Sequence, residues 1–121
     1  MGRYISTTGT AGVVTREINS AYNAVVNDRI LADSSSTGFT ITLPANASLL
    51  VSDTIQIIDA TSSAGTNAIT IDRNGSKIQG AAEDLTFDIT GGIVTMIYTG
   101  TTYGWIAVSY THLTLPTTST V

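Results

Sequence analysis

The 121-residue chain contains no cysteine, and only 12% of its residues are charged. Without thiols it has no disulfide framework, no thiolate nucleophile and no cysteine ligand for zinc. Hydrophobic residues make up 42% of the chain. The low charge therefore does not indicate intrinsic disorder, and a chain of this length predicts one folded domain.

Positive charge is scarce: five lysines and arginines stand against nine aspartates and glutamates, giving a net charge of −4. The cations are scattered along the sequence at Arg3, Arg16, Arg29, Arg73 and Lys77. Proteins that bind nucleic acid through its phosphates cluster their basic residues, so this pattern argues against such binding. No apolar run is long enough to span a membrane, and residues 1–10 lack the order of a signal peptide. We expect no membrane insertion.

Short segments of alternating apolar and polar residues, separated by turn residues, dominate the chain. With eleven glycines and only two prolines, and with many threonines, isoleucines and valines, the composition is typical of strands and turns. The predicted fold class is all-β, an antiparallel β-sandwich or jelly-roll-like domain of about seven or eight short strands. The expected strands are 29–33, 39–43, 53–59, 68–73, 77–79, 83–89, 93–98 and 105–108.

Two hairpins are expected within this pattern. Residues 34–38 should join the strands 29–33 and 39–43. Asn74-Gly75 should form a tight turn to the return strand 77–79, because both residues tolerate positive φ. Residues 45–51 suit a single helical or irregular turn, and residues 1–27 form an N-terminal arm that we expect to be extended. The expected core comprises Ile41, Leu43, Ile55, Ile57, Ile69, Ile71, Leu85, Phe87, Ile89 and Trp105.

The segment 93–98 is apolar on both of its faces. Such a strand is usually central in its sheet or covered by a neighbouring subunit, so it suggests a homo-oligomer.

Candidate chemistry is limited to carboxylates and aromatic rings. No pair of the nine carboxylates has a spacing that would set it across a substrate, and the loops around Asp53, Asp59 and Asp72 lack the regular spacing of a calcium loop. We therefore expect no enzyme activity, no catalytic residues, no cofactor and no metal. Tyr98, Tyr103 and Trp105 could stack on a sugar ring, although aromatic residues at strand ends more often pack in a core.

The C-terminal segment 109–121 resembles the translation of a sequencing adapter, on the string VSYTHLTLPT at residues 108–117. The resemblance implies that the native domain covers residues 1–108 and that the native protein continues differently. It also implies an environmental, metagenomic source. The chain's one histidine, His112, would then not be native, which leaves no imidazole for a catalytic triad or a metal site.

A second resemblance to known proteins rests on six short sequence segments that occur in a fixed order. They are GRYISTTGT at 2–10, DRILAD at 28–33, ITLPA at 41–45, DTIQIID at 53–59, ITIDRNGSKIQG at 69–80 and EDLT at 83–86. Together they resemble structural, tail-fibre-like proteins of tailed bacteriophages, in particular those of marine cyanophages. The resemblance implies a virion protein, a β-rich fibre module that assembles as a homotrimer and attaches to other virion proteins or to host surface glycans. It brings no catalytic residues.

Two other classes of function remain open on the sequence. A secreted carbohydrate-binding β-sandwich would need a signal peptide in the intact gene and an exposed aromatic platform. A capsid decoration protein would end shortly after Val108.

Overall fold

A computed structural model describes residues 12–110, with side chains up to residue 108. In this part of the chain the fold is all-β, with nine strands and one turn of 3-10 helix, η1 (Asn46–Ser48). The strands are β1 (Val14–Ile18), β2 (Tyr22–Asn23), β3 (Asp28–Ala32), β4 (Thr40–Thr42), β5 (Thr54–Asp59), β6 (Ile69–Asp72), β7 (Leu85–Phe87), β8 (Ile93–Tyr98) and β9 (Trp105–Tyr110).

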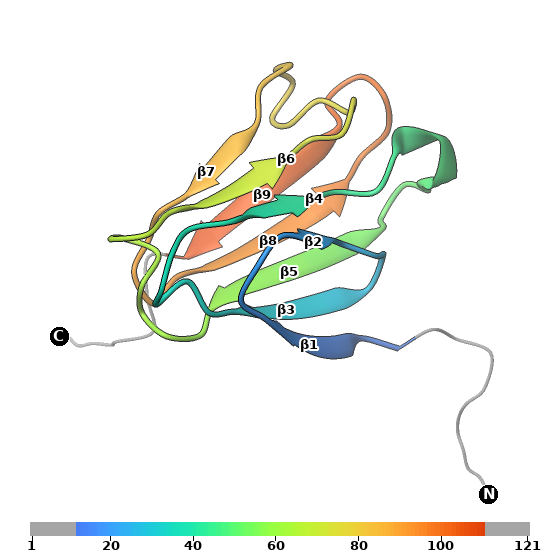
Figure 1. Cartoon of the computed structure of the whole chain (residues 1–121). Coiled ribbons are helices and arrows are strands. Elements are labelled where there is room, and N and C mark those ends of the chain that lie inside the picture. Colours follow the sequence, from blue (N-terminus) through green and yellow to red (C-terminus); the bar gives the residue numbers. More distant parts are fainter. Residues whose placement is uncertain (1–11, 111–121) are drawn as a thin grey trace, which may run out of the picture.

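The strands form two sheets that lie face to face (Figure 1). The five-stranded sheet has the order β1-β3-β5-β8-β9, and the four-stranded sheet has the order β2-β4-β6-β7. Buried side chains from both sheets form one hydrophobic cluster between them. The fold is therefore a two-layer β structure with its core between the layers.

The first six strands alternate between the two sheets, so the chain winds as a coil. β1, β3 and β5 pair in parallel, with Val14 opposite Asp28 and Arg29 opposite Gln56. β2, β4 and β6 pair in parallel in the other sheet. Each turn of the coil adds one strand to the five-stranded sheet and one to the four-stranded sheet. Chains in β-solenoids wind in this way.

The last three strands pair antiparallel with their neighbours instead. β7 pairs antiparallel with β6, β8 with β5, and β9 with β8. The loop after β6 then reaches β9, where the Trp105 N–H donates to the Lys77 carbonyl at 2.8 Å and the Gln79 N–H donates to the Trp105 carbonyl at 2.7 Å. Hydrogen bonds thus link the four-stranded side of the molecule to the edge of the five-stranded sheet.

The expected core is largely confirmed. Eight of its ten members are buried, namely Ile41, Leu43, Ile55, Ile57, Ile69, Ile71, Phe87 and Trp105. Leu85 and Ile89 are partly buried and pack against this cluster. Alternation identified the inward faces because a strand sends successive side chains to opposite sides.

The antiparallel prediction is wrong for the coiled part of the fold, where every strand pair is parallel. The expected hairpin across residues 34–38 does not form, because β3 and β4 belong to different sheets. Residues 34–38 instead carry the chain from one layer to the other. A Cβ on Gly38 would collide with the Ala68 carbonyl, so glycine permits this close approach of β4 to β6.

The Asn74-Gly75 turn forms as expected, with φ of 48° and 88° and a 3.1 Å hydrogen bond from the Ser76 N–H to the Arg73 carbonyl. The predicted return strand 77–79 does not pair with β6, whose antiparallel partner is β7. η1 lies within the turn expected at 45–51.

The domain boundaries at residues 27 and 108 stay predictions, because the structure describes only part of the chain at each end. The arm 1–27 is extended where the structure describes it, as β1 and β2, and residues 1–11 lie outside that part. β9 includes residues 109 and 110, which the sequence assigns to the tail, and the other tail residues lie outside the described range.

Candidate functional site

The outer face of the five-stranded sheet carries branched aliphatic side chains. Its inward residues, such as Ile30, Ile57 and Val94, are buried, so the residues that alternate with them point outward. We call the apolar members of this outward set the aliphatic face: Leu31, Ile58, Ile93, Ile97, Ile106 and Val108. Leu31, Ile58 and Ile93 stand side by side in register across β3, β5 and β8. Five of the six are half-buried, and Val108 is 38% exposed.

A polar row crosses the aliphatic face. The Arg29 Nε donates to the Gln56 Oε1 at 3.2 Å, and the Gln56 Nε2 donates to the Thr95 Oγ1 at 3.2 Å. These three residues are neighbours in register on β3, β5 and β8. Their polar groups are therefore partly satisfied by one another without any further partner.

The outer face of the four-stranded sheet has the opposite character. Its outward residues are Thr40, Thr42, Thr70, Asp72 and Thr86. We call this set the threonine face. A sheet that meets water on one side normally presents polar side chains there, which fits the threonine face and not the aliphatic face.

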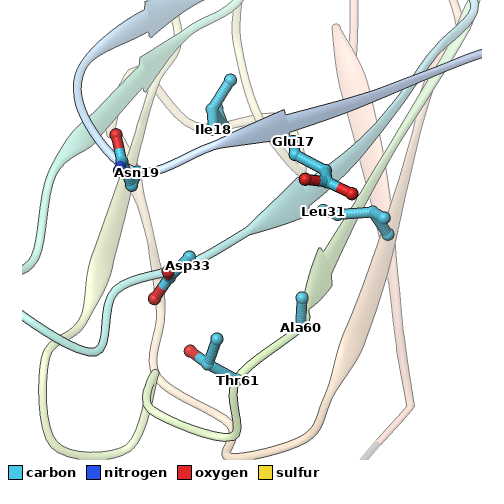
Figure 2. Close-up of a pocket in the computed structure, with 7 residues that line it drawn as sticks. All are labelled: Glu17, Ile18, Asn19, Leu31, Asp33, Ala60 and Thr61. Atoms are coloured by element: carbon cyan, nitrogen blue, oxygen red, sulfur yellow. The ribbon is translucent and has the colours of Figure 1, made fainter.

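A pocket of about 330 Å³ lies where the parallel strands β1, β3 and β5 end (Figure 2). It is lined by Glu17, Ile18, Asn19, Leu31, Asp33, Ala60 and Thr61. The Asp33 Oδ1 accepts hydrogen bonds from the Ser35 Oγ at 2.6 Å and the Ser35 N–H at 3.0 Å. These bonds lower the pKa of Asp33 below its usual value. Polar atoms around an aliphatic wall suit a small polyhydroxylated ligand.

Aspartates in this structure hold backbone loops. The buried Asp59 carboxylate accepts three backbone N–H groups: Ser63 at 3.1 Å, Ala64 at 3.0 Å and Gly91 at 2.8 Å. Asp53 accepts the Leu50 N–H at 2.7 Å. This local capping is typical of aspartate in turns.

Asp28 has a similar role between the first two coils. It is 3% exposed and accepts hydrogen bonds from the Arg16 Nε at 3.0 Å, the Tyr22 hydroxyl at 2.8 Å and the Val25 N–H at 2.9 Å. The hydrogen bond to Asp28 raises the pKa of Arg16. Burial, followed by the Asp28 hydrogen bond, raises the pKa of Tyr22. The carboxylate therefore joins β1, β2 and β3.

The three aromatic residues proposed for glycan contact occupy different environments. Trp105 is fully buried and Tyr98 is 4% exposed, and their rings meet edge to face with centroids 5.4 Å apart. Tyr103 is 61% exposed on the turn before β9. The structure therefore brings two of the rings into the core and leaves only Tyr103 of the three open to solvent.

Sequence reasoning missed most of the aliphatic face. It noted an apolar outer side only for 93–98, which lies between β5 and β9 in its sheet. The available signal was the pairing of adjacent large apolar residues at Ile30-Leu31 and Ile57-Ile58, which places one residue on each face of a strand.

No protein-family model and no curated protein sequence matches this chain. Within residues 12–110, no helix is long and apolar enough to cross a membrane. In the same part of the chain, no three histidine or carboxylate side chains are grouped so that they could hold a metal ion.

Proposed function

We propose that this protein is a non-enzymatic structural protein of a phage virion. In this proposal it is a tail-fibre or appendage module that assembles as a homotrimer and binds other virion proteins. The proposal is supported by the coiled topology, together with the six sequence segments that resemble those of tail-fibre-like proteins.

The coil is the observation that carries the proposal. Its parallel strands are stacked so that each turn of chain lengthens both sheets in the same direction. A fold of this kind grows along one axis by adding equivalent units, which suits an elongated scaffold. The two buried aspartates serve in this scaffold: Asp59 holds a loop to the turn before β8, and Asp28 holds one coil to the next.

The test is the mass of the complete 121-residue chain in solution. Sedimentation equilibrium over a wide concentration range should give a mass near three protomers, because the proposed module works as a trimer. A mass of one protomer at every concentration would contradict the proposal.

Carbohydrate binding is a second candidate function, favoured by the pocket at the ends of β1, β3 and β5. We expect saturation-transfer signals from neutral mono- and disaccharides, and we expect Asp33→Ala to reduce them at least about threefold by removing a charged acceptor. Asp72→Ala, on the threonine face, is the matched control and should leave them unchanged. Equal signals from both variants, or none from the wild type, would exclude this pocket as the sugar site.

A further inference from the structure

The two outer faces of this fold differ in a way that the isolated chain does not explain. The threonine face meets water with hydroxyl groups, whereas the aliphatic face meets it with six branched hydrocarbon side chains. No segment of residues 12–110 forms a third layer over the five-stranded sheet (Figure 1). The polar row divides these side chains, but so many branched aliphatic residues on the outer side of one sheet are typical of an interaction surface.

We propose that the aliphatic face is the surface through which identical copies of this chain associate. The proposal rests on the homo-oligomer proposed above and assigns its contact. The partners are the other copies of this chain, each turning its own aliphatic face toward the threefold axis of the proposed trimer.

Charge favours a second copy at this face. The whole chain has a net charge of −4, so identical copies repel one another in general. On the outward side of β1 and β3, however, the charged residues are Glu17 and Arg29, which are of opposite sign. The threonine face carries Asp72, and Glu83, Asp84 and Asp88 flank its strand β7. Identical copies therefore meet least repulsion across the aliphatic face.

The outer side of the five-stranded sheet, which includes the aliphatic face, the polar row and β1, is large enough for a specific contact. Five strands spaced about 4.8 Å apart, with about six residues at 3.3 Å each, cover about 500 Å². Two such faces together remove about 1,000 Å² from water, which is the lower limit for a specific interface.

The polar row is compatible with burial in such a contact. Arg29, Gln56 and Thr95 already hydrogen-bond to one another across three strands. These hydrogen bonds reduce the cost of burying the amide of Gln56 and the hydroxyl of Thr95, and the row restricts the register in which the copies fit.

The first test compares Ile58→Glu with Thr70→Glu in the complete chain. Both positions are half-buried on strands flanked by neighbours on both sides, Ile58 on the aliphatic face and Thr70 on the threonine face. We expect Ile58→Glu to raise the dissociation constant of the oligomer at least about tenfold, because it places an unpaired carboxylate in the contact. Thr70→Glu should change it by less than about twofold. Circular dichroism confirms that each variant retains the β spectrum.

A second measurement does not depend on disrupting the contact. Because the chain contains no cysteine, a single cysteine can be introduced at Thr95→Cys on the aliphatic face or at Thr70→Cys on the threonine face. A short bis-maleimide should cross-link copies of the Thr95→Cys variant and leave the Thr70→Cys variant largely uncrosslinked.

The outcomes separate this proposal from the one on which it rests. A wild-type chain that is monomeric throughout would overturn both. An oligomer that survives Ile58→Glu and cross-links better through Thr70→Cys would overturn only the assignment of the aliphatic face. Loss of association in Ile58→Glu, with retention in Thr70→Glu, supports both.

Discussion

Replacing Asp59 with alanine should lower the free energy of unfolding by about 3–5 kcal/mol, one of the two largest effects that we expect from a single substitution in this protein. Asp59 is the last residue of β5 and is 4% exposed. Its two oxygens accept the backbone N–H groups of Ser63, Ala64 and Gly91. Alanine would leave these donors without their acceptor, and each buried donor left unsatisfied costs about 1–3 kcal/mol.

Urea unfolding followed by circular dichroism measures this effect. Asp53→Ala is the matched control, because Asp53 also accepts a backbone N–H, that of Leu50, but in an exposed contact. Water can replace that acceptor, so the control should lose no more than about 1 kcal/mol. Equal losses in the two variants would show that the three contacts of Asp59 do not act together.

Replacing Trp105 with alanine should destabilise the protein by a similar amount, about 3–5 kcal/mol. The Trp105 side chain is fully buried, and its ring contacts that of Tyr98 at an interplanar angle of 64°. Its backbone N–H and carbonyl also hydrogen-bond to Lys77 and Gln79. The indole therefore fills the core at the place where the loop after β6 meets β9, and its removal leaves a large cavity.

Urea midpoints measured by circular dichroism, rather than by fluorescence, test this prediction, because Trp105 is the one tryptophan in the sequence. Tyr103→Ala removes a nearby aromatic ring that is mostly exposed and should change stability by less than about 0.5 kcal/mol. Trp105→Phe should lose less than Trp105→Ala, since it retains a ring in the core. If Trp105→Ala were no worse than Tyr103→Ala, the described packing of the indole would be wrong.

The sequence predicted the strands and their inward faces well, because both depend on local alternation. Ile55 and Ile57 alternate with Thr54 and Gln56, and the structure buries the first pair more than the second. The Asn74-Gly75 turn was also predictable, since its two positive φ angles favour those residue types.

The direction and partner of each strand could not be predicted in the same way. Alternation is identical in parallel and antiparallel pairs, so it does not distinguish β3 beside β5 from β3 in a hairpin with β4. The polar segment 34–38 is compatible with either connection. Only contacts far apart in the sequence, such as the approach of Gly38 to Ala68, decide between them.

The candidate site was predictable only in part. The apolar outer side of β8 was visible as an uninterrupted apolar run, but Leu31 and Ile58 join it only through register with neighbouring strands. The environments of Tyr98 and Tyr103 could not be separated either, because a tyrosine near a strand end has the same local pattern whether its ring lies in the core or in solvent.

The change from parallel coils to antiparallel strands also affects the order in which the chain can fold. β8 and β9 are joined by a short turn, so bringing them together costs little chain entropy. The parallel partners β3 and β5 must instead close a much longer stretch of chain, because Arg29 pairs with Gln56. We therefore expect the hairpin of β8 and β9, whose contacts are close in the sequence, to form first and to act as the folding nucleus. The parallel coils then pair with it at rates set by loop closure. For a chain synthesised from its N-terminus, the coils therefore leave the ribosome before the hairpin that is best suited to start folding.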